Sequence, residues 1–276
     1  MHMRRDFLRS TLVAGGITAA GCGRGHLPGE RTEIIAGNAT SDHLHVGAVI
    51  YPAMDQIDFT GPFEILSRLP DSTFHVLGKE NKPIRDVEGL LLTPEHTLAE
   101  APRLDVLIVP GGHGQQALME DEAVLGFLRR QAAGARYVFS VCTGALLIGA
   151  AGLLQGVRAT THWSSFHLLP YFGAIPVDAR VVVDGKVVSA AGVTAGIDGA
   201  LRLAALLRGV HTAQRIQLNI QYAPEPPFDS GTPSSAPPAV LAAEREAVGV
   251  LTEQRRRTAR RIAKRLQVTL PDGTAQ

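Results

Sequence analysis

Short apolar runs alternate along this chain with segments of helical periodicity, and this alternation limits the folds that the chain can adopt. Four runs have the pattern of buried strands, at residues 45–51, 74–77, 105–109 and 136–141. Segments of helical spacing lie after Pro62 and at residues 122–133, 143–154 and 199–207. Such alternation builds βαβ units, so we predict an α/β fold whose mostly parallel sheet is covered by helices on both faces.

Three local signals refine this expectation. Asp184 and Gly185 stand between two β-branched runs in Val181–Val188, which predicts a tight antiparallel hairpin at the margin of the sheet. Gly134 is expected to cap the helix at 122–133. Asp198 is suited to the N-terminal turn of the helix at 199–207, where its charge would favour the helix dipole.

The chain divides by composition into a main domain, residues 44–222, and two later segments. Prolines dominate residues 223–239, which predicts an extended arm. Residues 240–276 carry a long amphipathic helix and a tail, assigned to the same domain. Its basic residues are expected to form a solvated helix face: Arg260, Arg261, Lys264 and Arg265.

Overall composition narrows the functional classes. The 276 residues are 45% hydrophobic, which is enough for one large core. A formal net charge of +1 with 19% charged residues predicts no nucleic-acid partner and favours a small-molecule substrate. No zinc-ligand spacing, phosphate loop or dinucleotide fingerprint occurs in the sequence, so neither a metal nor a cofactor is predicted.

The N-terminal segment has the pattern of an export signal rather than of structure. Arg4 and Arg5 precede an Ala/Gly-rich run at 11–21 that is too short to span a bilayer, which predicts a twin-arginine signal over residues 1–22 and a flexible tether over 23–43. Cys22 stands where a lipoprotein cysteine would be acylated. Two interpretations stay open, lipid attachment at Cys22 or ordinary cleavage nearby. Both place the mature protein in the periplasm or on the membrane as a lipoprotein.

Cys142 is the strongest candidate for chemistry. The chain has only two cysteines, Cys22 and Cys142, so no disulfide framework supports the fold. Cys142, Thr143 and Gly144 lie between a predicted strand and a predicted helix, a turn that lifts a nucleophile out of the sheet. The helix N-terminus is expected to lower the pKa of the thiol. The alternative is a small buried side chain with no chemical role.

Five segments together carry a family resemblance. They are FTGP at 59–62, VPGGHG at 109–114, SVCTG at 140–144, ATTHW at 159–163 and GVTAGID at 192–198. In this order the chain resembles the ThiJ/PfpI superfamily over residues 45–266. The resemblance implies a class I glutamine amidotransferase-like, flavodoxin-like fold and a homodimer. It also implies that Cys142 is the nucleophile and that Asp58 is the acid facing it.

For other residues of these segments, both a role in the site and a purely structural role are compatible with the sequence. Asp58 would otherwise be a helix N-terminal cap. Gly111 and Gly112 offer backbone N–H groups to a substrate, or simply make a turn. His162 falls where related proteins have a histidine near the cysteine, and a structural histidine is equally compatible with the pattern. The predicted site residues are Cys142, Asp58 and Thr143 for catalysis, and Gly111, Gly112, His162 and Thr194 for the substrate pocket.

The resemblance is strongest to those members that hydrate isonitriles to N-substituted formamides through a thioimidate on the cysteine. Thr143 occupies the position where protease members carry histidine, which disfavours peptide cleavage. Two other hypotheses remain. The chain is a ligand-sensing domain like those of AraC-type regulators, or it is a stress protein that acts on dicarbonyls or peroxide.

Overall fold

The computed structural model describes residues 42–270. The predicted export signal, Cys22 and most of the predicted tether lie outside the described residues, as do the last six residues of the chain. The described part belongs to one compact unit. None of its helices combines the length and the apolar character that crossing a bilayer requires.

A seven-stranded sheet forms the centre of the fold. Its strand order is β10-β11-β7-β6-β1-β2-β5, and every pairing is parallel except that of β10 with β11. The strands are β1 (Leu44–Ile50), β2 (Ser72–Gly78), β5 (His96–Thr97), β6 (Val106–Val109), β7 (Tyr137–Val141), β10 (Val181–Asp184) and β11 (Val187–Ala190). All four residues of β6 are buried, as both-face coverage of the sheet requires.

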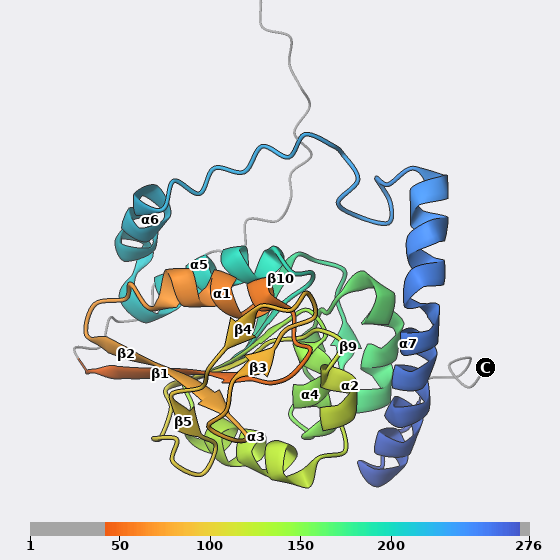
Figure 1. Ribbon diagram of the computed structural model, residues 1–276, viewed down its shortest axis with the longest axis horizontal. Coiled ribbons are helices and arrows are strands. Elements are labelled where there is room, and N and C mark those ends of the chain that lie inside the picture. Colours follow the sequence, from red (N-terminus) through yellow and green to blue (C-terminus); the bar gives the residue numbers. More distant parts are fainter. Residues whose placement is uncertain (1–41, 271–276) are drawn as a thin grey trace, which may run out of the picture. The chain divides into compact units, whose positions relative to one another are not determined.

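Helices cover both faces of the sheet (Figure 1). On one face α1 (Gln56–Leu66) packs against α5 (Ala195–Arg208), which is followed by α6 (Val210–Asn219). On the other face lie α3 (Glu122–Gly134) and α4 (Gly144–Ala150), which contact each other and β6 or β7. The short α2 (Gln115–Leu118) packs against α4. The predicted α/β class with a covered parallel sheet is confirmed.

The marginal hairpin is confirmed as well. β10 is the edge strand and pairs antiparallel with β11, with Gly185 in the turn at φ +54°. Two other small sheets accompany the main one and were not predicted. They pair β3 (Ile84–Arg85) with β4 (Leu91–Leu92), and β8 (Arg158–Ala159) with β9 (Ile175–Pro176).

Several predicted helix boundaries are wrong: α5 begins at Ala195 rather than at 199, and α4 ends at Ala150 rather than at 154. Two further errors concern Pro62 and Gly134. The helix expected after Pro62 begins at Gln56, and Pro62 lies inside it. Pro62 has no backbone N–H and so cannot donate a helical hydrogen bond. Packing stabilises the helix instead, because Phe59 and Ile65 are buried and Gly61 lies close to Ile197 of α5. Gly134 is the last residue of α3 rather than its cap, because Ala135 leaves the helix directly into an extended conformation before β7.

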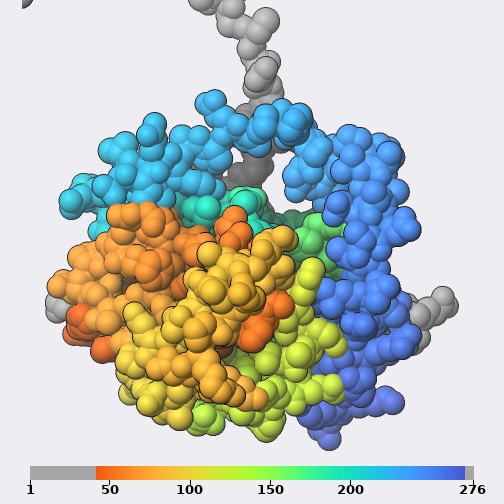
Figure 2. Space-filling model, viewed as in Figure 1, coloured from red at the N-terminus to blue at the C-terminus, as the bar shows by residue number. Residues whose placement is uncertain are grey.

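The chain beyond the sheet consists of an exposed arm and a long helix. A 3-10 helix, η1 (Trp163–Phe172), was not predicted, and the C-terminal helix α7 (Pro238–Arg265) packs on it. The arm begins after α6 and ends at Pro237, since Pro238 is already the first residue of α7. Figure 2 shows the arm in light blue running across to α7, which lies in darker blue along one side.

The sheet topology determines where a site can form. The chain runs from β1 outward to β2 and β5, then crosses to β6 on the other side of β1 and continues to β7. The direction of winding therefore reverses between β1 and β6. In open α/β sheets, the carboxyl ends of strands at such a reversal leave a crevice for ligands. The segments that follow β1, β6 and β7 meet there.

Candidate active site

Cys142 occupies a strained turn between β7 and α4. Its φ of +55° lies in the left-handed region, which is uncommon for a residue with a side chain and costs on the order of 1 kcal/mol. Two hydrogen bonds hold the turn. The Cys142 N–H donates to the Ala190 carbonyl at 3.0 Å, and the Thr161 hydroxyl donates to the Cys142 carbonyl at 2.7 Å. The predicted nucleophile turn is therefore present in the structure.

Small neighbours make the turn sterically feasible. A Cβ at Gly144 would lie 2.0 Å from the carbonyl oxygen of Val109, so only glycine lets α4 start this close to the end of β6. The same strand end continues into Gly111, where a Cβ would lie 2.5 Å from the Thr143 nitrogen. The β6 and β7 turns are thus in backbone contact, and any side chain at either glycine would separate them.

Asp58 faces Cys142 from the first turn of α1. The residue that caps this helix is Asp55, whose side chain accepts from the Ile57 N–H at 3.0 Å, so the alternative role of Asp58 as a cap is excluded. The Asp58 carboxyl is completely buried and contacts the Cys142 thiol. Its Oδ2 accepts from the Gly111 N–H at 2.9 Å. Its Oδ1 has no hydrogen-bond partner among the described residues.

Burial keeps both reactive groups protonated at neutral pH. Desolvation, followed by repulsion from Asp55, raises the pKa of Asp58 to about 8, although the Gly111 N–H and the Cys142 thiol act in the opposite direction. Desolvation and the nearby Asp58 charge raise the pKa of the Cys142 thiol well above its usual range. The Thr143 N–H and Arg255 lower this thiol pKa but do not outweigh burial. The sequence-based expectation of a lowered thiol pKa is therefore wrong, because it counted the helix terminus and not the burial.

The glycine loop after β6 is held by the site's own groups. The Gly111 N–H is engaged by Asp58, and the Gly112 N–H donates to the Thr143 hydroxyl at 3.1 Å. The Tyr51 hydroxyl lies 2.6 Å from the Pro110 carbonyl and 2.9 Å from the Gly111 carbonyl. Both amide donors that were expected to face a substrate are thus occupied in this structure. They orient Asp58 and Thr143 instead.

Thr143, His162 and Thr194 differ in their surroundings. The Thr143 hydroxyl is buried and bonded to Gly112, and its N–H points to the Cys142 sulfur. His162 caps η1, with its Nδ1 2.8 Å from the Ser164 hydroxyl. Burial lowers the pKa of His162 to about 4, so this ring is neutral. Thr194 is exposed and accepts from Arg180 at 3.2 Å. These contacts favour a structural role for the last two.

Sequence reasoning missed three residues that the structure brings to the site. Tyr51 and Thr161 were included in the predicted strand and in a family segment, but without a role. Arg255 lies on α7 and hydrogen-bonds the Gly112 carbonyl at 2.9 Å. A signal for Arg255 was available, because it stands four residues before Ala259 and so continues the apolar stripe of α7 rather than its basic face.

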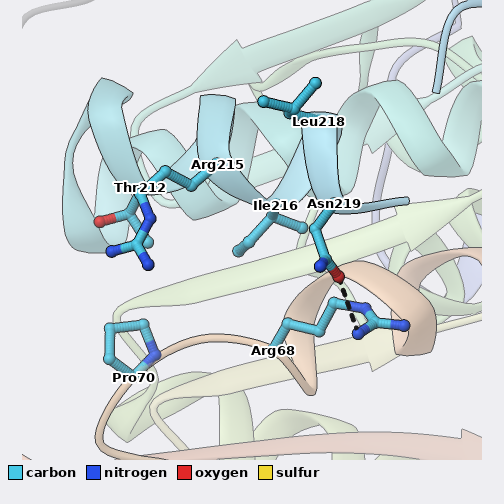
Figure 3. Close-up of a pocket in the computed structure, with 7 residues that line it drawn as sticks. All are labelled: Arg68, Pro70, Thr212, Arg215, Ile216, Leu218 and Asn219. Carbon is cyan, nitrogen blue, oxygen red and sulfur yellow. Dashed lines mark hydrogen bonds between the residues drawn. The ribbon is translucent and has the colours of Figure 1, made fainter. Parts of the chain in front are cut away.

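Neither a large surface pocket nor a metal cluster competes with this assignment. A pocket of about 560 Å³ lies between the end of α1 and α6 (Figure 3), and Arg68 bonds Asn219 across it at 3.2 Å. Its lining contains no cysteine and none of the site residues. Within residues 42–270, no group of three or more His, Cys, Asp or Glu side chains is arranged to hold a metal ion.

Comparison with known proteins identifies several similar proteins. Isonitrile hydratase from Pseudomonas putida is 55% identical over 198 residues, which cover 72% of this chain and 87% of that protein. A ThiJ/PfpI family protein from Pseudomonas syringae, known from its crystal structure, has a TM-score of 0.78 at 37% identity. That comparison covers 85% of this chain and 97% of the other.

More distant relatives include a regulator. The HTH-type transcriptional regulator GbdR from Pseudomonas aeruginosa is 32% identical over 132 residues, covering 47% of this chain and 36% of that protein. The profile of the DJ-1/PfpI family matches residues 45–206, a segment that contains Asp58, the glycine loop and the Cys142 turn. The chain belongs to the DJ-1/PfpI family.

Proposed function

We propose that this protein hydrates isonitriles to N-substituted formamides, with Cys142 as the nucleophile and Asp58 as the proton relay. The observation that carries the proposal is the pairing of a buried thiol with a buried carboxylic acid whose pKa is raised to about 8. The 55% identity to an isonitrile hydratase supports it. The substrate is a small molecule, and the proposed residues need no cofactor.

The first step suits a neutral thiol and acid. The terminal carbon of an isonitrile accepts a nucleophile only as it receives a proton. Asp58 gives its proton to that carbon while the Cys142 sulfur bonds to it. The thiol proton passes to the Asp58 carboxylate. The net change is addition of S–H across the carbon, which gives the thioimidate R–N=CH–S–Cys142 and restores the protonated acid.

Water completes the reaction in the second step. A water molecule adds to the thioimidate carbon, and proton transfer to nitrogen gives a tetrahedral intermediate that carries the sulfur and a hydroxyl group. Asp58 shuttles the proton, since its Oδ1 has no other partner among the described residues. The C–S bond then breaks, the hydroxyl proton goes to the departing sulfur, and R–NH–CHO leaves. One water molecule is consumed, and both side chains regain their starting protonation.

The test is conversion of cyclohexyl isocyanide by the purified full chain. We expect N-cyclohexylformamide to accumulate over many turnovers, and brief reaction followed by acid quenching to give a Cys142 adduct heavier by one isonitrile. Mass spectrometry of the product in ¹⁸O-water checks that the formyl oxygen comes from solvent. A protein that forms neither formamide nor adduct would exclude the proposal.

Stress chemistry is disfavoured by the same geometry. Peroxide reacts with thiolates, and burial raises the pKa of the Cys142 thiol and reduces the thiolate fraction at neutral pH. Ready formation of sulfinic acid after mild peroxide, without hydratase turnover, would favour it. A sensor role is disfavoured because, within the described part of the chain, one helix, α7, follows the arm and packs on η1. A DNA-binding regulator needs a helix-turn-helix pair there.

We also propose a homodimer. Large apolar side chains on α6 and the arm are exposed, with Leu218 81% and Phe228 77% accessible. A second copy covering the arm would remove them from water. Sedimentation velocity should give twice the mass of the chain. A monomer at micromolar concentration would argue against the dimer.

Export through a twin-arginine signal, with or without acylation of Cys22, is the proposal for location. It is supported by Arg4 and Arg5 before the short apolar run. The intact mass of the protein recovered from cells distinguishes the versions, since acylation leaves a lipidated Cys22 at the new N-terminus. An unprocessed chain retained in the cytoplasm would contradict both.

A further inference from the structure

Arg255 departs from the pattern of the helix that carries it. Its side chain is buried, with only 3% of the residue exposed, whereas Arg257, two positions later on α7, is 71% exposed and pairs with Glu253. A buried guanidinium is costly to desolvate unless charged or polar partners surround it. Its position in the interior therefore needs a reason beyond the amphipathic pattern of the helix.

The partners of Arg255 come from three other segments. One terminal nitrogen donates to the Gly112 carbonyl at 2.9 Å, and the other to the Ser165 hydroxyl at 3.4 Å. Nε donates to the Gln115 side-chain oxygen at 3.0 Å. The guanidinium thus joins α7 to the glycine loop, to α2 and to η1.

All of these partners are neutral. No carboxylate among the described residues forms an ion pair with Arg255, so its buried positive charge has no permanent counter-ion. The groups that interact with it electrostatically are the Cys142 thiol and the Tyr51 hydroxyl, and the nearby His162 ring stays neutral. Each of these groups is uncharged in the resting site.

The acidic groups that face Cys142 come from the start of α1, Asp55 at its N-cap and Asp58 in its first turn. Asp58 and Asp55 both disfavour a negative charge on the sulfur, as does burial, while the Thr143 N–H and Arg255 favour it. The Thr143 backbone N–H contributes a fixed dipole. Arg255 is the full positive charge among these groups, so it acts most strongly when the sulfur becomes negative.

We propose that Arg255 is a positioning residue of the reaction: it fixes the Gly111–Gly112 loop that orients Asp58, and its charge stabilises the Cys142 sulfur when that sulfur loses its proton. This inference rests on the proposed function for its effect on turnover. Sulfur carries negative charge twice in the cycle, as it attacks the isonitrile carbon and as it leaves the tetrahedral intermediate. Arg255 therefore serves both steps without touching the substrate.

The experiment titrates the thiol of the full chain in a Cys22→Ser background, which leaves Cys142 as the single thiol. Ultraviolet absorbance of the thiolate is followed against pH for Arg255, Arg255→Gln and Arg255→Lys. Arg257→Gln is the matched control, since it removes the same charge from the exposed face of the same helix. Circular dichroism checks that each variant is folded. No isonitrile is needed, so the result is independent of the hydratase assay.

We expect Arg255→Gln to raise the thiol pKa by about one unit, which is a tenfold loss of thiolate at a given pH. Its kcat should fall at least about tenfold with KM within about twofold, because the lost interaction acts on the reacting sulfur. Arg255→Lys should keep the thiol pKa within about half a unit and recover part of kcat. Arg257→Gln should match the parent in both.

An unchanged thiol pKa in folded Arg255→Gln would overturn the inference. If Arg255→Gln does not fold, Arg255→Lys alone decides. This variant keeps the charge but not the forked hydrogen bonds, so a retained thiol pKa with a lower kcat supports the inference. A thiol pKa raised by a full unit despite the retained charge, or an unchanged kcat, overturns it.

Discussion

Replacing Cys142 by serine is expected to lower kcat/KM for cyclohexyl isocyanide by at least about 10³-fold. Serine has nearly the shape of cysteine and can keep the backbone hydrogen bonds of the turn, so the fold should survive. Its hydroxyl is a much weaker nucleophile and leaving group than the thiol. The loss should therefore appear in kcat while the unfolding transition moves little.

The assay is formamide release under matched protein concentrations, with Cys22→Ser as the control for removal of a thiol elsewhere. That control should retain full activity. The acid-quenched adduct should disappear in Cys142→Ser and persist in Cys22→Ser. Turnover undiminished in Cys142→Ser would remove Cys142 from the mechanism, whatever the reaction proves to be.

Replacing Asp58 by asparagine is expected to lower kcat by about 10²- to 10⁴-fold and to change how stability depends on pH. Asparagine fits the same buried space and can accept from the Gly111 N–H, but it has no proton to relay. Because the pKa of Asp58 rises from an ordinary 3.8 to about 8 on folding, the folded state holds a proton that the unfolded state releases between these values.

That proton determines the sign of the pH dependence of stability. Asp58 reduces the free energy of unfolding progressively as pH rises from about 4 to about 8, and the effect then levels off. Between pH 5 and pH 8, the loss attributable to this group is on the order of 3 kcal/mol in wild type. Asp58→Asn has no carboxyl at this position and does not show this loss, so the variant should gain stability relative to wild type as pH rises.

Urea unfolding of both proteins at pH 5 and pH 8 measures this difference. Comparing the two proteins at each pH cancels groups that they share, including His162 and His75, whose lowered pKa values reduce stability in acid. A difference between variant and wild type that is the same at both pH values would mean that Asp58 is already ionised in the folded protein. The proposed relay would then start from a carboxylate.

Much of the fold could be predicted from the sequence because its signals are local. Buried strands such as 105–109 show as continuous apolar runs, and the Asp-Gly pair identified the β10–β11 hairpin. Helix α1 was misplaced because a proline normally marks a helix start, whereas here packing on α5 carries the helix through Pro62. The 3-10 helix η1 escaped prediction since its sequence, WSSFHLLPYF, has no strong helical period.

In the site too, local features could be predicted from the sequence and contacts between distant residues could not. The turn that presents Cys142 can be predicted from consecutive residues, because a strand, a cysteine and small neighbours are enough to specify it. The partnership with Asp58 came from resemblance to a family, since nothing local joins residues so far apart in the chain. Arg255 was overlooked among the basic residues of α7, most of which do face solvent as expected.

By itself, the sequence determined the layered α/β architecture and the residue that carries the reactive sulfur, both of which depend on patterns only a few residues long. Only the tertiary structure decided the protonation of that sulfur and of its acid, and the identity of the cation beside them. The reason is that desolvation and Coulomb interactions depend on distance in space. Here the groups that control them come from α1, the loop after β6 and α7, which only folding brings together.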